Sequence, residues 1–278
     1  MPRPSHTLRP LPIQSIDGDA YTPSRQRPVR VRSRSLPVDT HFEPHRHAWA
    51  QLAYCASGIV QVTSVTPDEV TYIVPPTRAV WIEPGALHAI NVLERAEFRT
   101  LYIHADETPA GWEGCRVIVV SPLLREMVHA LDALEEHELG SARETMLSGL
   151  LVDEITHADT QPLGVPMPHA QQGDKRLRAL CEAVLRAPAE RATLAEWAAD
   201  TGASERTMAR LFRDELGISY QQWRQQAILA HALPLLARGT PVSQVAAASG
   251  YASDSAFSAM FKSAMGQSPS YFQNKIGH

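Results

Sequence analysis

The sequence is poor in cysteine and in long apolar runs. Its three cysteines, Cys55, Cys115 and Cys181, stand far apart, so it has neither a CxxC pair nor the even count that a disulfide framework requires. It contains no run of about 18 apolar residues, and its first residues lack the apolar core of a signal peptide. We therefore expect a cytoplasmic protein that is neither exported nor inserted in a membrane.

A strong overall charge is also missing, because the net charge is −4 at pH 7. The charge is unevenly distributed: residues 174–278 hold 12 Lys and Arg against 9 Asp and Glu, whereas residues 1–173 hold 14 against 21. A mildly basic C-terminal part is compatible with an anionic partner. The length of 278 residues exceeds the roughly 100 to 200 residues of a typical domain, which favours two domains.

The N-terminal part is predicted to be irregular at first and then rich in β-strands. Residues 1–35 are rich in Pro and Arg, and we expect a solvated tail rather than an arm that binds phosphate. Between residues 36 and 120, short β-branched and aromatic runs such as VTYIV and AVWIE alternate with Pro and Gly. This spacing predicts a small β-barrel or sandwich.

Helical periodicity begins at residue 121. Residues 121–157 predict a helical hairpin, because Met127, Leu131 and Leu134 recur at helical spacing. Residues 158–173 include three prolines and two glycines, which predicts a linker between domains. The remainder, residues 174–278, is helical in pattern.

This C-terminal part contains an internal repeat with an offset of 49 residues. Each copy has an N-cap serine, an apolar stripe and a glycine stop, and a short helix with a glycine turn precedes it. A short helix, a tight turn and a second capped helix form the helix-turn-helix layout. The aligned pairs include Ser204 and Ser253, Phe212 and Phe261, and Gly217 and Gly266.

The segments LAEWAADTGASERTMARLFRDELGISYQQWRQQ and VAAASGYASDSAFSAMFKSAMGQSPSYF resemble the twin helix-turn-helix domain of the AraC family of transcriptional regulators. The resemblance implies double-stranded DNA, a small-molecule effector and RNA polymerase as partners. Two positions depart from the family pattern. Ile228 stands where a basic residue is common, and Pro234 lies inside the expected connecting helix. Proline removes a backbone donor, so we expect that helix to kink or to start afresh there.

Contacts with DNA are expected on the face opposite the apolar stripe of each copy. Arginine bonds two acceptors on a guanine edge, whereas serine makes short and permissive contacts, so we predict that the arginine-rich first copy reads most of the bases. The alternative for each arginine is a phosphate contact or a solvated position, because at least half of protein–DNA hydrogen bonds go to the backbone. The predicted DNA-binding residues are Ser204, Arg206, Thr207, Arg210, Arg213, Ser253, Ser255, Ser258 and Lys262.

A second motif lies in the β-rich part. The segment HRHAWAQLAYCASG directs His45, His47, Trp49 and Gln51 to one face of a strand, since strand side chains alternate. With the G-x-x-H sequence that ends at His88, it resembles the two motifs of the cupin family. In that family, two histidines and a glutamate of the first motif and one histidine of the second hold a divalent metal. Gln51 replaces the glutamate here.

Three imidazoles and an amide oxygen form a candidate site for zinc, nickel or iron, with open positions for a ligand. The alternative is a plain effector pocket in which the histidines only form hydrogen bonds. The residues predicted to bind metal are His45, His47, Gln51 and His88, and Trp49 joins them as a predicted ligand-binding residue.

These features predict a multidomain protein: an all-β cupin barrel with a helical hairpin, then an all-α domain with two helix-turn-helix motifs. In AraC-type regulators with an N-terminal cupin, such hairpins often form the dimer interface, so a homodimer is expected. The leading hypothesis is a ligand-responsive regulator and not an enzyme. The alternative is a metal-dependent cupin enzyme fused to a DNA-binding domain, against which the missing glutamate argues. A regulator of DNA-alkylation repair would need a reactive cysteine cluster, which three scattered cysteines do not provide.

Overall fold

The computed structural model describes residues 12–13, 21–65, 69–190 and 193–276. Most of residues 1–20, part of the predicted Pro- and Arg-rich tail, lies outside these ranges. No helix within the described ranges is long and apolar enough to cross a membrane. The strands are β1 (Pro12–Ile13), β2 (Val29–Leu36), β3 (His41–His45), β4 (Ala50–Ser64), β5 (Glu69–Val74), β6 (Arg78–Ile82), β7 (His88–Ile103), β8 (Arg116–Val119), β9 (Thr160–Gln161) and β10 (Gly164–Met167). The helices are α1 (Pro122–Asp132), α2 (Ala142–Thr156), α3 (Lys175–Arg186), α4 (Leu194–Ala198), α5 (Glu205–Leu216), α6 (Tyr220–Ala237), α7 (Val242–Ala248), α8 (Asp254–Met265) and α9 (Pro269–Ile276).

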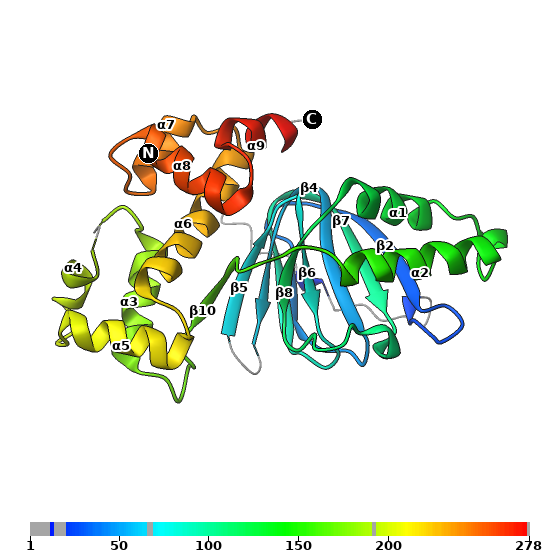
Figure 1. Cartoon of the computed structure of the whole chain (residues 1–278), viewed down its shortest axis with the longest axis horizontal. Coiled ribbons are helices and arrows are strands. Elements are labelled where there is room, and N and C mark those ends of the chain that lie inside the picture. The colour runs from blue at the N-terminus through cyan, green and yellow to red at the C-terminus, as the bar shows by residue number, and fades with distance from the viewer. Residues whose placement is uncertain (1–11, 14–20, 66–68, 191–192, 277–278) are drawn as a thin grey trace, which may run out of the picture.

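The chain has the expected two-domain layout, with a sheet-rich half followed by a helical half (Figure 1). Strands β4 and β7 are long antiparallel partners, and each takes different neighbours along its length. The first part of β4 pairs with β6 and its second part with β5. The first part of β7 pairs with β3 and its second part with β2. Apolar side chains of these strands form the interior core, which includes Phe42, Val62, Val80, Ile90 and Phe98.

The sheet is open. The pairings of the described residues run in the order β1-β3-β7-β4-β6-β8-β9, with β2, β5 and β10 paired beside this path, and they do not return to their starting strand. The closed barrel predicted from the sequence is therefore not confirmed.

The prediction of a solvated tail up to residue 35 is wrong in its last part, because strand β2 begins at Val29 and pairs with β7 over its full length. The arginines of VRVRSRSL disguised the alternation of a strand. Their side chains are half-buried, and the guanidinium groups of Arg32 and Arg34 lie 4.8 Å and 5.6 Å from the ring centres of Tyr21 and Phe42. Contacts of this kind let arginine occupy a partly apolar interior.

The predicted linker of residues 158–173 is also partly wrong, since it contains β9 and β10. Strand β10 lies at an edge of the sheet, where it pairs with β5, and a proline is tolerated in an edge strand. Val165 and Met167 of β10 are buried against helices of the C-terminal half. The segment is thus a structured part of the junction between the two halves.

Helices α1 and α2 form the predicted hairpin and cover the face of the sheet remote from the helical half (Figure 1). Met127 and Leu131 are 4% and 9% exposed and belong to a core with Leu52, Trp81 and Leu101 of the sheet. The apolar stripe that suggested a dimer interface is therefore packing within the chain.

The helical half follows the repeat. Gly217 and Gly266 end α5 and α8 in the left-handed conformation, with φ of 68° and 75°, as a glycine stop requires. Helix α6 joins the two copies and continues through Pro234 to Ala237, so it does not start afresh at the proline.

Helix α6 also docks the helical half onto the sheet, where it contacts β4, β5, β7 and β10. Ile228 is 1% exposed and shares a core with Ile59 and Ile73 of the sheet, which explains why an apolar residue stands at this position. Beside this core, the indole Nε1 of Trp223 donates to the carbonyl oxygen of Pro166 at 2.7 Å.

Candidate functional site

The histidines singled out in the sequence converge at one end of the sheet. His45 at the end of β3 lies opposite His88 at the start of β7, and their ring centres are 4.3 Å apart. His47 follows in the turn to β4, and its ring centre is 5.2 Å from that of His88. The ligand atoms that these three rings offer all lie within 4.8 Å of one another. Gln51 of β4 completes the group and is 2% exposed.

Backbone carbonyls orient the three rings. Nδ1 of His45 lies 2.8 Å from the carbonyl oxygen of Glu43, Nδ1 of His47 lies 2.6 Å from that of Trp49, and Nδ1 of His88 lies 3.0 Å from that of Ala86. A carbonyl oxygen only accepts, so each Nδ1 carries the proton and each Nε2 keeps its lone pair. The Nε2 atoms of His47 and His88 lie 2.9 Å and 3.2 Å from Oε1 of Gln51.

His88 is the most deeply buried ring of the cluster. Burial lowers the pKa of His88 to about 3, so its imidazole is uncharged at neutral pH. Trp49, predicted to share this face, stacks on His47 with ring centres 5.2 Å apart and planes inclined by 5°. Two other polar side chains of the sheet half have partners elsewhere: His104 accepts from the backbone N–H of Asp106, and Arg78 donates to the carbonyl oxygen of Met265 in the helical half.

Two arginines that the sequence motifs did not predict lie beside the cluster. A small cavity of about 10 Å³ is lined by Arg32 and Arg34 of β2, by His45 and Gln51, and by residues of β7 including Thr100 and Tyr102. The signal was present, since Arg32 and Arg34 are two residues apart and so face the same side of a strand. It was overlooked because this segment was interpreted as a tail.

Arg78 makes a buried contact between the two halves. Arg78 is 4% exposed. Its Nη2 donates, at 2.9 Å, to the carbonyl oxygen of Met265 at the C-terminal end of α8. Its Nε donates to Oε1 of Gln161 at 2.6 Å. Burial lowers its pKa to about 10. The sheet thus holds the end of α8 directly.

The predicted DNA-binding residues lie on α5 and α8 and at their N-caps. Ser204 and Ser253 cap the two helices, because their hydroxyls accept from the backbone N–H groups of Thr207 and Ala256 at 3.2 Å and 3.3 Å. Apart from Thr207 and Ser258, which are half-buried, the predicted residues are exposed. One arginine has a partner, since Nη1 of Arg210 donates to Asp214 at 3.0 Å.

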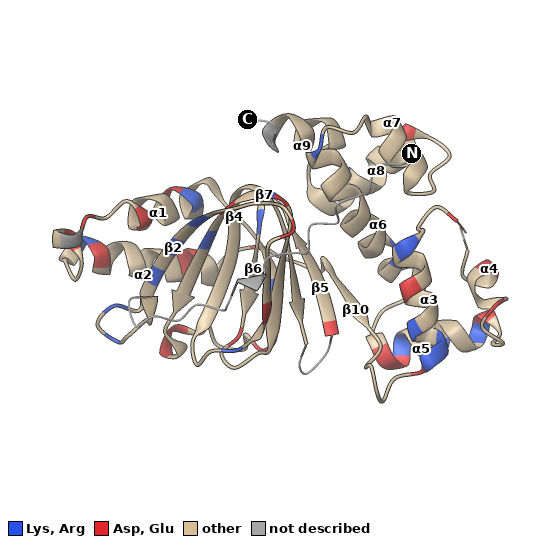
Figure 2. Cartoon of the chain, turned by 180° about the vertical axis from the view of Figure 1, so that it is seen from behind, with Lys and Arg blue, Asp and Glu red and all other residues tan. Residues whose placement is uncertain are grey.

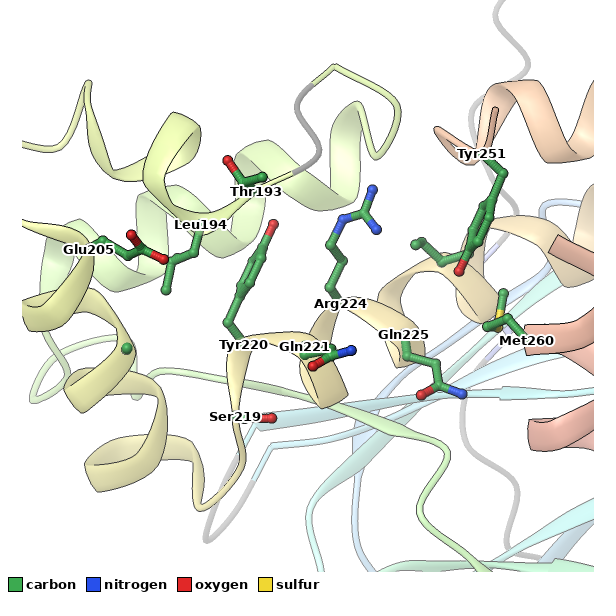
Figure 3. A pocket seen from close by; sticks show the side chains of 12 residues that line it. Thr193, Leu194, Glu205, Ser219, Tyr220, Gln221, Arg224, Gln225, Tyr251 and Met260 are labelled. Carbon is green, nitrogen blue, oxygen red and sulfur yellow. The ribbon is translucent and has the colours of Figure 1, made fainter. Parts of the chain in front are cut away.

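The two helices differ in the number of their charged side chains, as Figure 2 shows. Basic and acidic side chains both gather on α5 and the adjacent α3, whereas α7 and α8 carry few charged groups. Between the two helix pairs lies a cavity of about 640 Å³ (Figure 3). Tyr220 and Arg224 of α6 project into it, facing Tyr251 and Met260 from the second pair.

Known proteins share both halves of the chain. A family model described as a helix-turn-helix domain matches residues 197–275, and one described as an AraC-like ligand binding domain matches residues 31–211. The chain is 32% identical over 248 residues to the HTH-type transcriptional regulator NimR of Escherichia coli (strain K12), covering 82% of this chain and 89% of that protein. It is 32% identical over 113 residues to the HTH-type transcriptional regulator RipA of Corynebacterium glutamicum, covering 41% of this chain and 32% of that protein. Among solved structures, ToxT from Vibrio cholerae O395 aligns over 89% of this chain and 98% of its own, with 12% identity and a TM-score of 0.38.

Proposed function

Because this chain belongs to the AraC family of HTH-type transcriptional regulators, we propose that its sheet holds a metal-containing effector pocket and that two helix-turn-helix motifs bind DNA. The chain is a regulator with a ligand-binding N-terminal domain and a DNA-binding C-terminal domain. The family and the curated relatives are regulators and not enzymes, as the sequence predicted. The alternative of a metal-dependent cupin enzyme finds no support in them.

The repeated helix pair is the observation that carries the DNA-binding proposal. Helices α4 and α5 meet at a turn containing Gly202, and α7 and α8 meet at one containing Gly250, with φ of 69° and 78°. Helix α6 separates the pairs by 18 residues, which is ~27 Å at the rise of an α-helix. The turn of B-DNA is of similar length, about 34 Å. We infer that α5 and α8 enter successive major grooves on one side of the duplex.

Within this arrangement, we assign base reading chiefly to α5. Arg206 and Arg213 are exposed on it, and Arg210 is held only by an exposed partner that DNA displaces at little cost. Ser255, Ser258 and Lys262 of α8 offer shorter side chains and a single positive charge. The caps Ser204 and Ser253 and the adjacent Thr207 suit phosphate contacts, because backbone N–H groups at a helix N-terminus attract anions.

The DNA-binding proposal is tested with the full chain and fragments of its own promoter region. The logarithm of affinity is expected to fall linearly with the logarithm of salt concentration, by about 0.9 for each phosphate contacted. A fluorescence-anisotropy titration at several salt concentrations measures that slope. Binding that ignores salt, or no binding to any fragment, would remove the assignment of α5 and α8 as the DNA-contacting helices.

The metal proposal depends on the donor set of the cluster. With every Nδ1 proton directed to a carbonyl oxygen, the Nε2 atoms of His47 and His88 and Oε1 of Gln51 are all acceptors at hydrogen-bond distance. A divalent cation satisfies them together with His45. The Nδ1 contacts also match the second-shell hydrogen bonds that orient metal-bound histidines. The residues present therefore fit zinc, nickel or ferrous iron, and a bound metal would supply open coordination positions for an effector.

The alternative, a pocket without metal, requires the Gln51 amide to be turned round so that its nitrogen donates to His47 and His88. Its two hydrogens serve only those two rings. The two arrangements differ in metal content, which decides between them. In either case, the long shared strands β4 and β7 and the placement of the histidines support a cupin-like, though open, sensor.

We further propose that the protein acts as a homodimer through the hairpin, on a different face from the one predicted. The predicted stripe is buried within the chain, but Leu123, Met146 and Leu150 are 50%, 69% and 48% exposed on α1 and α2. Met146 and Leu150 are one turn apart on α2, and adjacent exposed apolar residues are a feature of protein interfaces. Two copies would present two DNA-binding domains to one operator. Because a transcriptional regulator acts at a promoter, we also propose RNA polymerase as a partner and the cytoplasm as its location.

A further inference from the structure

The small cavity beside the histidines has an unusual balance of charge. Arg32 and Arg34 line it, and its lining in the described part of the chain includes no Asp or Glu. The three histidines and Gln51 are neutral ligands. A divalent metal bound there would keep its full charge of two, with the guanidinium groups adding to it.

One of the two arginines has a donor that no described residue satisfies. Nη1 of Arg32 is buried without a hydrogen-bond partner in the described part of the chain, while the guanidinium lies over the ring of Tyr21. A buried charged donor without a partner is unfavourable, because it loses its hydration and gains no hydrogen bond in return. Arg32 nevertheless remains in the interior. Thr100 of the neighbouring strand β7 lies directly opposite it.

The strand register places Arg32 and Gln51 beside the same cavity. Arg32 of β2 pairs with Thr100 of β7, Gln51 of β4 pairs with Tyr102 of β7, and Thr100 and Tyr102 face the same side because they are two residues apart. The three adjacent strands therefore carry Arg32 and the metal-ligand candidate Gln51 to the same cavity.

From these observations, and resting on the metal site proposed above, we propose that the effector is a small carboxylate. One carboxylate oxygen takes an open position on the metal, and the other accepts from the guanidinium of Arg32. Carboxylate and guanidinium match in shape and form charge-assisted hydrogen bonds. The cavity, about 10 Å³, has the size of one water molecule, so the lining side chains must move apart to admit even the smallest carboxylate.

The test uses the full chain loaded with Co²⁺, whose visible absorption reports changes among its ligands. Acetate, oxalate, inorganic phosphate and acetamide are titrated by calorimetry and by absorption. Acetate or oxalate is expected to bind and to change the Co²⁺ spectrum, and acetamide, the neutral counterpart of acetate, is not. Arg32→Gln is expected to weaken carboxylate binding by about tenfold or more with unchanged Co²⁺ content. Arg95→Gln, an exposed arginine of the same sheet, is the matched control and should bind like the wild type.

The outcomes separate this proposal from the one on which it rests. Equal binding of acetate and acetamide, phosphate binding in place of carboxylates, or unchanged carboxylate affinity in Arg32→Gln each overturns the carboxylate proposal and leaves the metal site standing. A wild-type chain that takes up no Co²⁺ removes the metal site. Calorimetry of acetate and oxalate with that metal-free chain then decides: carboxylate binding that depends on Arg32 supports the anion site, and its absence overturns it.

Discussion

Gln51 determines the charge of the sensor pocket. Its amide oxygen lies within reach of two imidazoles in the place where a glutamate would bring a negative charge. A neutral ligand binds a divalent cation less strongly than a carboxylate does. It also leaves more of the cation's charge uncompensated, and this charge attracts an anionic ligand. In the proposed metal site, glutamine in place of glutamate is therefore expected to weaken metal retention and to strengthen the attraction for an anionic effector.

Removal of the imidazoles is expected to empty the site. His47→Ala combined with His88→Ala should reduce bound zinc, nickel or iron from near one per chain to near zero, because two of three nitrogen ligands are lost. Plasma mass spectrometry of protein purified without chelator measures this. His137→Ala, a histidine whose side chain is 77% exposed on the hairpin, should keep its metal. Gln51→Glu should hold metal more tightly. Wild-type protein that is free of metal would leave the histidines as ordinary pocket groups.

Arg206 and Arg210 are expected to matter more for operator binding than the serines of α8. Replacement of an arginine that bonds a guanine in two places costs about 1 to 3 kcal/mol and relaxes base preference at that position. Arg206→Ala and Arg210→Ala should each weaken binding, at least one with altered preference, and Ser255→Ala or Ser258→Ala much less. Selection from randomised sites with all four variants measures both effects. Scrambled preference in the serine variants alone would make α8 the reader.

Elements differed in how well the sequence predicted them. The helical half was predicted nearly completely, because N-cap serines, glycine stops and the 49-residue offset are local signals, and Ser204, Ser253, Gly217 and Gly266 all fulfil them. Strand β2 and strand β10 were missed, because arginine and proline hide the alternation of a strand and only tertiary contacts stabilise these segments. In the histidine cluster, His45, His47 and Gln51 followed from the alternation of a strand, and His88 followed from the resemblance to the cupin motifs. The reach of Arg78 to α8, across 187 residues, left no trace in the sequence.

The hairpin of α1 and α2 is predicted to form the dimer interface. Met146→Glu with Leu150→Glu is expected to give monomers that remain folded, because both side chains are already exposed. Light scattering gives the mass, and circular dichroism gives the fold. Val38→Glu, an exposed apolar residue of the sheet half, is the control and should remain dimeric. By contrast, Leu131→Glu should unfold the domain, since it buries a charge in the core. If the hairpin double variant keeps the wild-type mass, the interface lies elsewhere.

The two halves of the molecule meet over a continuous surface. Ile59 and Ile73 of the sheet share a core with α6 and α8, Arg238 of α6 forms an ion pair with Glu94, and Arg78 caps the end of α8. A ligand changes DNA affinity only through a difference in its affinity for two arrangements of the protein. We expect such a difference to reach the DNA-binding helices through these contacts.

Loss of the Arg78 contact is expected to weaken that coupling. Arg78→Met leaves the carbonyl oxygen of Met265 and Oε1 of Gln161 without their donor, at about 1 to 3 kcal/mol for each buried group. The ratio of operator affinities with and without metal should therefore move toward one, while the metal content stays the same. Anisotropy titrations with metal-loaded and metal-free protein give the ratio, and Arg95→Gln should keep the wild-type value. An unchanged ratio in Arg78→Met would place the coupling in other contacts.

The shared core at the junction also makes the protein one thermodynamic unit. Ile228 and Leu229 share a core with residues of both the sheet and α8, and Val165 of β10 is buried among α3, α5 and α6, so each half covers apolar surface of the other. Heating should therefore melt both halves in a single transition, and a chain cut after residue 173 should expose apolar surface and aggregate. An effector at a hundred times its Kd adds about 2.7 kcal/mol to folding. Through this junction, that stabilisation extends to helices that the effector never touches.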